Sequence, residues 1–301
     1  MVDVGGRQLH IDVRGRGSPA VVLEAGIAAS SISWSLVQDR IAEFATVVSY
    51  DRAGLGWSRH AAPHRPTALA AAEEFAVLLE CAGVAPPFIL VGHSFGGLIV
   101  RIFQQTFPEK VAGLVLVDPV CRVEWARATP QRKKTLARGV ALSRRGAFLA
   151  HMGVVRLALK LLMAGSRVIP RLVARASAGS GAGVTERLAG EVRKLPREFW
   201  PIVAAHWSEA ACFEAMADSL EKLPVSVRQI QEGRPLGDLP IVVLSAGTSH
   251  ESAIREHEHD ARLSTRGQHI IVPAAGHWIQ LDQPDAVIEA IKHVLLQASG
   301  S

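Results

Sequence analysis

The sequence has few cysteines and no long uninterrupted apolar run. Cys81, Cys121 and Cys212 are far apart and odd in number, which does not suit a disulfide framework. We therefore expect a reducing, cytoplasmic environment. The N-terminus has no apolar stretch typical of a signal peptide, and no run of 18 uncharged apolar residues occurs. Export by a signal peptide and a membrane-spanning helix are therefore not expected.

Motifs for cofactors, nucleic acids and metals are also missing. No dinucleotide-binding or phosphate-binding glycine motif occurs, so no cofactor is expected. No nucleic-acid-binding module is recognisable, and nucleic acid is not expected as a partner. His257 and His259 alternate with acidic residues. On a helix they would point about 200° apart and could not share a metal ion, so no metal site is predicted.

Short apolar runs alternate with stretches of helical periodicity in both terminal parts of the chain. Of the 301 residues, 49% are hydrophobic and 20% are charged. The hydrophobic share is large enough to form the core of a globular protein. A Gly-Gly pair at 5–6 indicates a β-hairpin at the start of the chain. Strands are expected at 20–23, 46–50, 88–91, 111–117, 241–244 and 269–272. Nearly all-apolar strands between helices predict an α/β protein with a mostly parallel sheet covered on both faces.

The strand-and-helix rhythm stops in the middle of the chain. Residues 121–231 are rich in Ala, Leu and Arg, have helical periodicity and carry no strand signals. We therefore predict one α/β core formed by 1–120 and 232–301, with 121–231 inserted as a helical cap. That the cap acts as a lid over a site is a hypothesis.

Positive charge is concentrated in this insertion. From Arg122 to Arg175 there are thirteen Lys or Arg and one acid, Glu124, which gives +12 and leaves −7 for the rest of a chain with net charge +5. On a continuous helix four cations would fall within an arc of about 60°: Arg156, Lys160, Arg167 and Arg171. Peripheral contact with an anionic membrane is one interpretation, and a solvated cap surface is the other. Gly165 and Pro170 argue against an uninterrupted helix.

A GxSxG motif, Gly92-His93-Ser94-Phe95-Gly96, lies between an expected strand at 88–91 and an expected helix at 97–107. A sharp turn from strand to helix exposes the serine hydroxyl beside a base, which a weak nucleophile needs. Only small residues fit two positions before and after the serine. The following helix directs N–H groups toward developing negative charge. Ser94 is therefore the candidate nucleophile, and a chance glycine-rich turn is the alternative.

Several segments together resemble the α/β-hydrolase superfamily. They are GHSFGG at 92–97, Ala-Gly at 25–26, DRAGLGWS at 51–58 and Ala-Gly-His at 275–277, and their order along the chain also matches. The resemblance implies an eight-stranded, mostly parallel sheet, a Ser–acid–His triad and hydrolysis without a cofactor. The motifs are specific for the fold and do not identify a substrate. We read 51–58 as a structural turn near the pocket.

The candidate base is His277, in a loop after the expected strand at 269–272. Its place near the end of the chain fits the order serine, acid, histidine. Asp118 is the preferred acid because it ends the strand that follows the nucleophile helix, 24 residues after Ser94. Glu251 is the alternative, since many members of the superfamily place the acid after the strand here expected at 241–244. Asp118 can also be read as a simple turn residue.

Two backbone amides are the candidate oxyanion donors. Phe95 follows the nucleophile, and Ile27 follows Ala25-Gly26, which is similar to the superfamily's His-Gly-X segment with alanine in place of histidine. A simple glycine turn is the alternative for the second segment.

These candidates predict a serine hydrolase that cleaves a carboxylic ester or related acyl bond of a small apolar substrate through an acyl-enzyme. Acyl transfer to an acceptor other than water, and a non-catalytic binding protein of the same fold, are the alternatives. Five tryptophans could line an apolar pocket: Trp57, Trp125, Trp200, Trp207 and Trp278. The oligomeric state cannot be read from the sequence.

Overall fold

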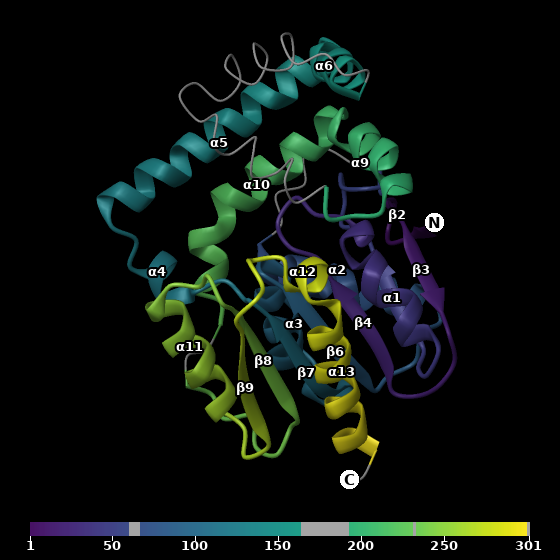
Figure 1. Ribbon diagram of the computed structural model, residues 1–301, viewed down its shortest axis with the longest axis vertical. Helices are drawn as coiled ribbons and strands as arrows, with labels where there is room; N and C mark the ends of the chain where they lie inside the picture. Colours follow the sequence, from purple (N-terminus) through teal and green to yellow (C-terminus); the bar gives the residue numbers. More distant parts are fainter. Residues whose placement is uncertain (60–66, 164–192, 231–232, 300–301) are drawn as a thin grey trace.

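The computed structural model describes residues 1–59, 67–163, 193–230 and 233–299 (Figure 1). Its main sheet has the strand order β3-β5-β4-β6-β7-β8-β9, in which β3 is antiparallel to β5 and the other neighbours are parallel. The strands are β3 (Ile11–Arg14), β4 (Ala20–Glu24), β5 (Val47–Tyr50), β6 (Phe88–His93), β7 (Val111–Val117), β8 (Ile241–Ala246) and β9 (Gly267–Val272). The predicted α/β class and mostly parallel sheet are therefore confirmed.

The expectation of eight strands is wrong for the described residues, where the main sheet has seven. The predicted N-terminal hairpin forms, but β1 (Val2–Asp3) and β2 (Gln8–Leu9) pair only with each other around the turn at 5–6. Each strand is two residues long, and the chain leaves this ladder at His10, whose N–H donates to the Ser58 hydroxyl at 2.8 Å. The hairpin is therefore too short to extend the main sheet.

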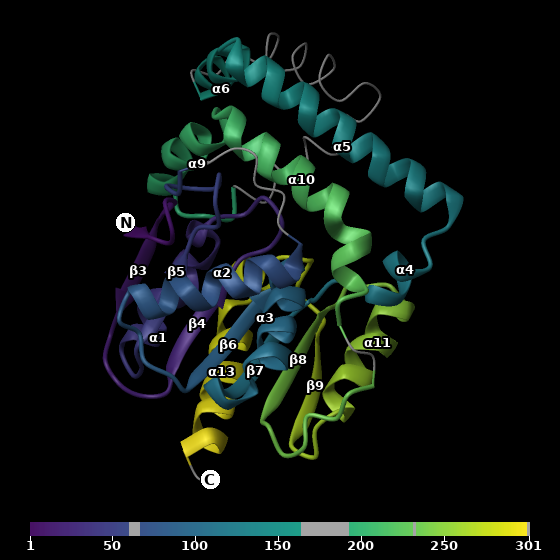
Figure 2. The same cartoon turned by 180° about the vertical axis from the view of Figure 1, so that it is seen from behind.

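Helices cover both faces of the sheet, because its strands are apolar on both sides. On one face, Val22 and Leu90 pack with α2 (Ala68–Cys81) and α3 (Phe95–Thr106). On the other, Leu23 packs with α1 (Ser35–Ala42) and α13 (Pro284–Ser299). Figures 1 and 2 show these two layers from opposite sides. The described residues of the core also form α11 (Glu251–Arg262) and α12 (Ile279–Asp282). Short 3-10 helices in the described ranges are η1 (Ser31–Trp34), η2 (Pro108–Lys110) and η3 (Arg197–Phe199).

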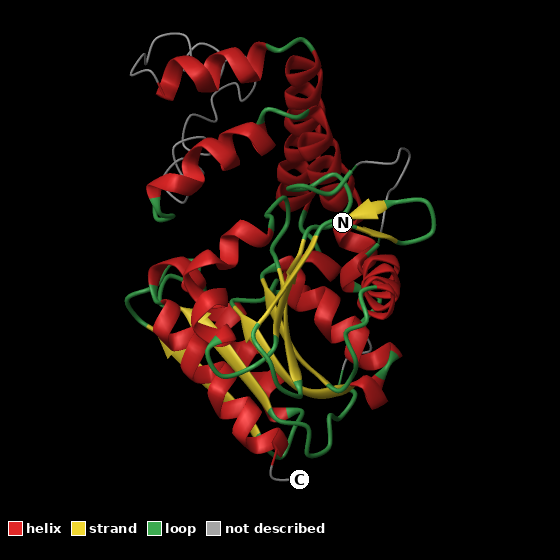
Figure 3. Cartoon of the chain, turned by 90° about the vertical axis from the view of Figure 1, so that its right-hand side faces the viewer, coloured by secondary structure: helices red, strands yellow, loops and turns green. Residues whose placement is uncertain are grey.

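Between β7 and β8 the described residues form helices and no strand. These are α4 (Arg122–Ala126), α5 (Pro130–His151), α6 (Val154–Met163), α9 (Trp200–Trp207) and α10 (Ala210–Val227). Figures 1 and 2 show them gathered at one end of the sheet, with α10 between α5 and the core. Figure 3 shows helices beyond the same end of the sheet from the side. The helical character of this segment is as expected, whereas its division from the core at 121 and 231 stays a prediction. In the ranges described, no helix is long and apolar enough to cross a membrane.

Candidate active site

The turn between β6 and α3 holds Ser94 in a conformation that L-residues rarely adopt, with φ 53° and ψ −116°. Three backbone hydrogen bonds fix it. The Ser94 N–H donates to Val117 O at 3.0 Å, and the Ser94 carbonyl accepts from Gly97 N at 3.0 Å and from Val120 N at 3.2 Å. A strained serine of this kind persists only where its surroundings over-determine it, and such positions cluster at functional sites.

Two glycines make this turn possible, as the motif predicts. A Cβ atom on Gly92 would lie 2.6 Å from the Gly96 carbonyl oxygen. A Cβ atom on Gly96 would lie 2.4 Å from the backbone oxygen of Glu24. Gly26, in the loop after β4, is also confined, because its Cβ would lie 2.9 Å from His93 Nδ1 and 3.4 Å from the Ser94 Cβ. The loop after β4 is therefore in contact with the nucleophile turn.

Ser94, His277 and Asp118 form one hydrogen-bonded chain. The Nε2 atom of His277 lies 3.0 Å from Ser94 Oγ, and its Nδ1 atom lies 2.6 Å from Asp118 Oδ2. Ser94 and Asp118 are buried, whereas half of the His277 side chain is exposed. The structure thus brings the three together from the ends of β6, β7 and β9.

The alternative acid, Glu251, lies apart from this chain. It is the first residue of α11, its carboxylate pairs with Arg255, and 77% of its side chain is exposed. The geometry therefore favours Asp118 over Glu251 as the acid beside His277.

Both carboxylate oxygens of Asp118 take part in hydrogen bonds. Its Oδ1 atom accepts from the Ala246 N–H at 3.0 Å and from the Ser249 hydroxyl at 2.6 Å, while Oδ2 faces His277. Burial alone would raise the pKa of Asp118. The hydrogen bond and charge of His277, together with the hydrogen bonds from Ser249 and Ala246, hold this pKa below its ordinary value. The carboxylate is thus kept ionised beside the imidazole. Ser249 was missed in the sequence because only the fold brings it to Asp118.

His93, the variable position of the GxSxG motif, supports the His277 loop. Its Nε2 atom lies 2.9 Å from the His277 carbonyl oxygen, and because a carbonyl only accepts, Nε2 carries the proton. Burial and the nearby His277 lower the pKa of His93 to about 3, so the ring is neutral. The ring also lies 4.8 Å from the His277 ring and 4.9 Å from that of Trp278. This role was missed in the sequence, because only the fold brings the His277 loop to His93.

We expect His93→Phe to lower kcat about fivefold to tenfold, the value of one hydrogen bond, and to change KM little. The loop that carries His277 would lose its tether, so fewer molecules would hold Nε2 against Ser94. Steady-state kinetics on an ester test this. His93→Gln, which can restore a donor, is expected to recover part of kcat.

His269→Phe is the matched control, because His269 bonds only to Ser245 Oγ, at 2.8 Å, among the described side chains. An unchanged kcat in His93→Phe, or an equal loss in the control, would contradict a positioning role.

Phe95 and Ile27, whose amides are the candidate oxyanion donors, border the same cavity as Ser94. Within the described ranges neither donates to another group of the chain. Phe95 begins α3, so the field of the helix N-terminus adds to its amide. Ile27 lies in a turn closed by a 3.2 Å bond from the Ala29 N–H to the Gly26 carbonyl. The role of both amides as oxyanion donors stays a prediction.

Arg52 braces the loop that carries Ile27. Its guanidinium donates to the carbonyl oxygens of Ala25 and Gly26 at 2.7 and 2.6 Å and pairs with Glu24, which also accepts from a tyrosine hydroxyl. With both carbonyls occupied, the peptide planes of the loop are fixed. Arg52 belongs to the DRAGLGWS segment, and its contact with this loop could not be read from sequence.

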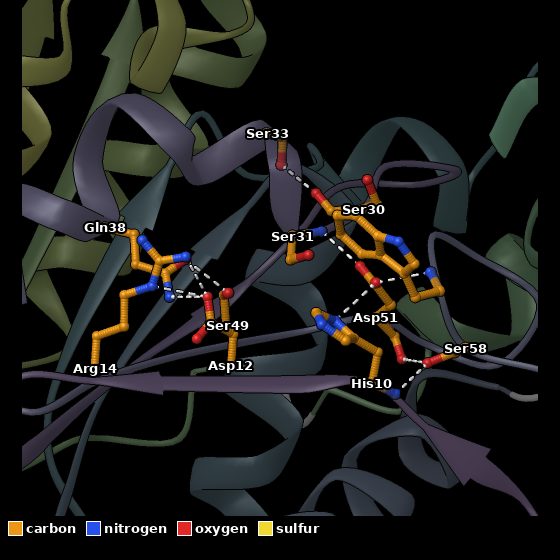
Figure 4. Close-up of polar contacts among 11 residues, drawn as sticks. His10, Asp12, Arg14, Ser30, Ser31, Ser33, Gln38, Ser49, Asp51 and Ser58 are labelled. Carbon is orange, nitrogen blue, oxygen red and sulfur yellow. Dashed lines mark hydrogen bonds and ion pairs between the residues drawn. The ribbon is translucent and has the colours of Figure 1, made fainter. Parts of the chain in front are cut away.

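Asp51, at the start of that segment, is fully buried and organises the rest of it (Figure 4). It accepts from the Ser31 N–H at 2.7 Å and the Trp57 N–H at 3.0 Å, and lies 3.1 Å from His10 Nδ1. A Cβ on Gly56 would lie 2.2 Å from the Asp51 carboxylate, which explains the glycine. These contacts support the interpretation of 51–58 as a structural turn.

Arg122 anchors the start of the helical segment to α11. Its N–H and Nε donate to Glu256 at 2.7 and 2.8 Å, and its Nη2 pairs with Asp260 at 2.5 Å. Glu256 also accepts from the Val123 N–H at 3.0 Å and the Cys121 thiol at 3.0 Å. The chain is therefore clamped immediately after the strand that carries Asp118.

A cavity of about 300 Å³ opens beside Ser94 and His277. Most of its lining is apolar and comes from loops at the sheet edge and from the helices α3, α4, α10 and α11: Ile27, Phe95, Val120, Trp125, Leu220, Leu223 and Ala253. Of the five tryptophans considered, Trp125 lines this cavity, while Trp200 and Trp207 pack in a separate apolar cluster. The cavity suits an apolar group next to the serine.

His257 and His259 lie on different sides of α11, as expected from their spacing. His257 is buried between Ser245 Oγ at 2.7 Å and the Pro119 carbonyl at 2.9 Å, and His259 is exposed. Across the described parts of the chain, no group of three or more His, Cys, Asp or Glu could hold a metal ion.

Comparison with known proteins gives one consistent family. Residues 19–284 match the family model described as alpha/beta hydrolase fold. The chain is 38% identical over 120 residues to an AB hydrolase superfamily protein of Gibberella zeae, covering 37% of each chain. It is 27% identical over 235 residues to the sn-1-specific diacylglycerol lipase ABHD11 of Mus musculus, covering 77% of this chain and 67% of that one.

A thermophilic esterase from Thermogutta terrifontis superimposes with a TM-score of 0.68 at 20% identity, covering 98% of this chain and 96% of that one, a likeness that concerns the fold alone. The chain spans less than half the length of several curated relatives that it matches.

Proposed function

The chain belongs to the alpha/beta hydrolase family, and from that premise we propose that it is a serine hydrolase of carboxylic esters or related acyl bonds. The observation that carries the proposal is the hydrogen-bonded chain from Ser94 Oγ through His277 to Asp118 beside an apolar cavity. A nucleophile, a base and a group that orients the base, each within hydrogen-bond reach, are what acyl transfer to a serine requires.

In the first half of the reaction, Ser94 Oγ attacks the substrate carbonyl carbon while His277 Nε2 accepts the hydroxyl proton. The Nδ1–H of His277 donates to Asp118, which leaves the Nε2 lone pair facing Ser94. The ionised carboxylate then stabilises the imidazolium. The tetrahedral oxyanion accepts hydrogen bonds from the Phe95 and Ile27 amides.

In the second half, the carbon–oxygen bond to the alcohol breaks, and the His277 imidazolium gives its proton to the leaving oxygen. Water enters, His277 takes one of its protons, and the hydroxide attacks the acyl-enzyme. Collapse of this second intermediate releases the carboxylic acid and returns the proton to Ser94. The exposed half of His277 leaves room for water to enter from solvent.

The apolar cavity supports a small apolar acyl group as the substrate moiety. A pocket of about 300 Å³ lies at the lower end of the range for small-molecule sites. Trp125, Leu220 and Leu223 come from the helical segment, so that segment contributes to the choice of substrate.

A fluorophosphonate probe tests the proposal. We expect the protein to become labelled at neutral pH and the adduct to map to Ser94 by peptide mass spectrometry, because only an activated serine attacks the probe. A protein that stays unlabelled, or is labelled at another residue, would instead fit the non-catalytic binding protein.

p-Nitrophenyl esters of increasing chain length test the substrate class. We expect kcat/KM to rise with chain length while the acyl group fits the cavity and to fall at least tenfold for long-chain esters, since each misfitting methylene alters transition-state binding. Trp125→Ala is expected to move this optimum to longer chains. A profile independent of chain length in both proteins would contradict the assignment of the cavity.

A further inference from the structure

The helices α5 and α6 carry eight Lys or Arg residues and no Asp or Glu. Part of this charge is neutralised on the side that faces α10. Arg144 pairs with Glu221 at 2.6 Å, and His151 lies 3.2 Å from Glu214. Acids of α10 therefore face the inner side of α5.

The outer side of α5 has a different composition. Six exposed residues recur every three or four positions and fall within an arc of about 80° on a helix: Lys134, Arg138, Ala141, Arg145, Phe148 and Met152. No ion pair or hydrogen bond from the side chains of the three cations is recorded within the described ranges. We call these six residues, with Leu157 at the start of α6, the outer face.

The outer face exposes large apolar side chains in addition to cations. Phe148 is 65% exposed, Met152 66% and Leu157 56%. They flank the turn between α5 and α6, which lies far from the sheet (Figure 1). Several exposed large apolar side chains together mark an interaction surface, and here they adjoin unpaired positive charge.

We propose that the outer face docks on the surface of an anionic lipid bilayer. Phe148, Met152 and Leu157 enter the boundary between headgroups and acyl chains, and the cations contact lipid phosphates. A helix with cations and large apolar side chains suits this interface, because anionic headgroups and apolar acyl chains lie within a few ångströms of each other there. Duplex nucleic acid is a poorer fit, since its backbone binds cations and polar groups but offers no apolar contact for the exposed phenylalanine and methionine.

The sequence placed a basic helical face at Arg156, Lys160, Arg167 and Arg171. Arg156 pairs with Glu209 at 2.7 Å, and Arg167 and Arg171 lie outside the described residues. The surface proposed here therefore lies on α5 and its turn into α6, a different set of side chains from the one expected.

Co-sedimentation of the full chain with vesicles tests the proposal. We expect binding to phosphatidylcholine vesicles that contain phosphatidylglycerol, much weaker binding to phosphatidylcholine alone, and loss of binding as salt is raised. Because each cation contributes about fivefold to the partition coefficient, Arg138→Glu with Arg145→Glu should lower it at least about 25-fold.

Two further variants separate insertion from simple charge attraction. Phe148→Ser with Met152→Ser keeps the charge and is expected to lower binding at least about tenfold, since both side chains lose apolar contact. Arg16→Glu with Arg228→Glu is the charge-matched control, at two exposed arginines outside α5 and α6, and should bind nearly as the unchanged protein does. Hydrolysis of a water-soluble ester, unchanged in all variants, shows that they are folded.

Three results would overturn the proposal. The first is no binding of the unchanged chain to anionic vesicles at low salt. The second is full binding by Phe148→Ser with Met152→Ser, which would indicate a general polyanion site that nucleic acid could occupy as well. The third is an equal loss in the charge-matched control, which would reflect net charge rather than the outer face.

Discussion

Ser94→Ala is expected to lower kcat for an ester by about 10⁶-fold, the loss seen when a serine hydrolase loses its nucleophile. KM should change little, because the cavity and the candidate oxyanion amides stay in place. The remaining rate, about 10³-fold above that in water, would come from those amides and from binding. Steady-state assays with an active-site titration measure it.

The substitution leaves the fold intact for a specific reason. The backbone angles at Ser94 are strained for any residue with a Cβ atom. Because serine and alanine both have one, the energetic cost of this conformation is similar for the two residues. Ser252→Ala is the matched control, a serine whose hydroxyl donates to Glu124 at 2.8 Å, away from His277. If Ser94→Ala kept more than a hundredth of the original kcat while the control was unaffected, another group would be the nucleophile.

Asp118→Asn is expected to lower kcat about 10⁴-fold. An amide in place of the carboxylate can present its NH₂ to His277 Nδ1, which favours the tautomer whose Nε2 carries the proton and cannot accept one from Ser94. It also removes the negative charge that stabilises the imidazolium. The backbone should hold, since the amide oxygen can still accept from the Ala246 N–H and the Ser249 hydroxyl.

Glu251→Gln distinguishes the two candidate acids. Its carboxylate pairs with Arg255 in solvent, so we expect kcat within about twofold of the original. A normal rate in Asp118→Asn together with a large loss in Glu251→Gln would transfer the role to Glu251. Measuring both proteins on one ester at one pH makes the comparison direct.

The sequence predicted features whose cause is local. Gly92 and Gly96 were informative because a Cβ at either position would collide with backbone within the turn or the loop beside it. The parallel sheet was predictable because strands buried on both faces are apolar throughout. His277 was found by its place after the last strand, which the superfamily's order made meaningful.

The supporting residues could not be found in this way, because their roles depend on which loops the topology brings together. Ser249 follows β8, where many members of the superfamily carry the acid, and here it donates to an acid that follows β7 instead. Arg52 braces a loop 26 residues earlier in the chain, and His93 reaches a carbonyl 184 residues later. The strand count was wrong because it was taken from the resemblance to the superfamily, whereas the main sheet of the described residues has seven strands.

The clamp at Arg122 has a consequence for how this protein can change. Because Glu256 and Asp260 hold Arg122, four residues after Asp118, we expect a change in the helices beyond Arg122 to leave the Asp118 carboxylate in place. Mutations that lengthen, shorten or replace those helices would then alter what the enzyme accepts while leaving intact the machinery that breaks the bond. The substrate range of this scaffold can therefore change through the helical segment between β7 and β8, while the α/β core stays the same.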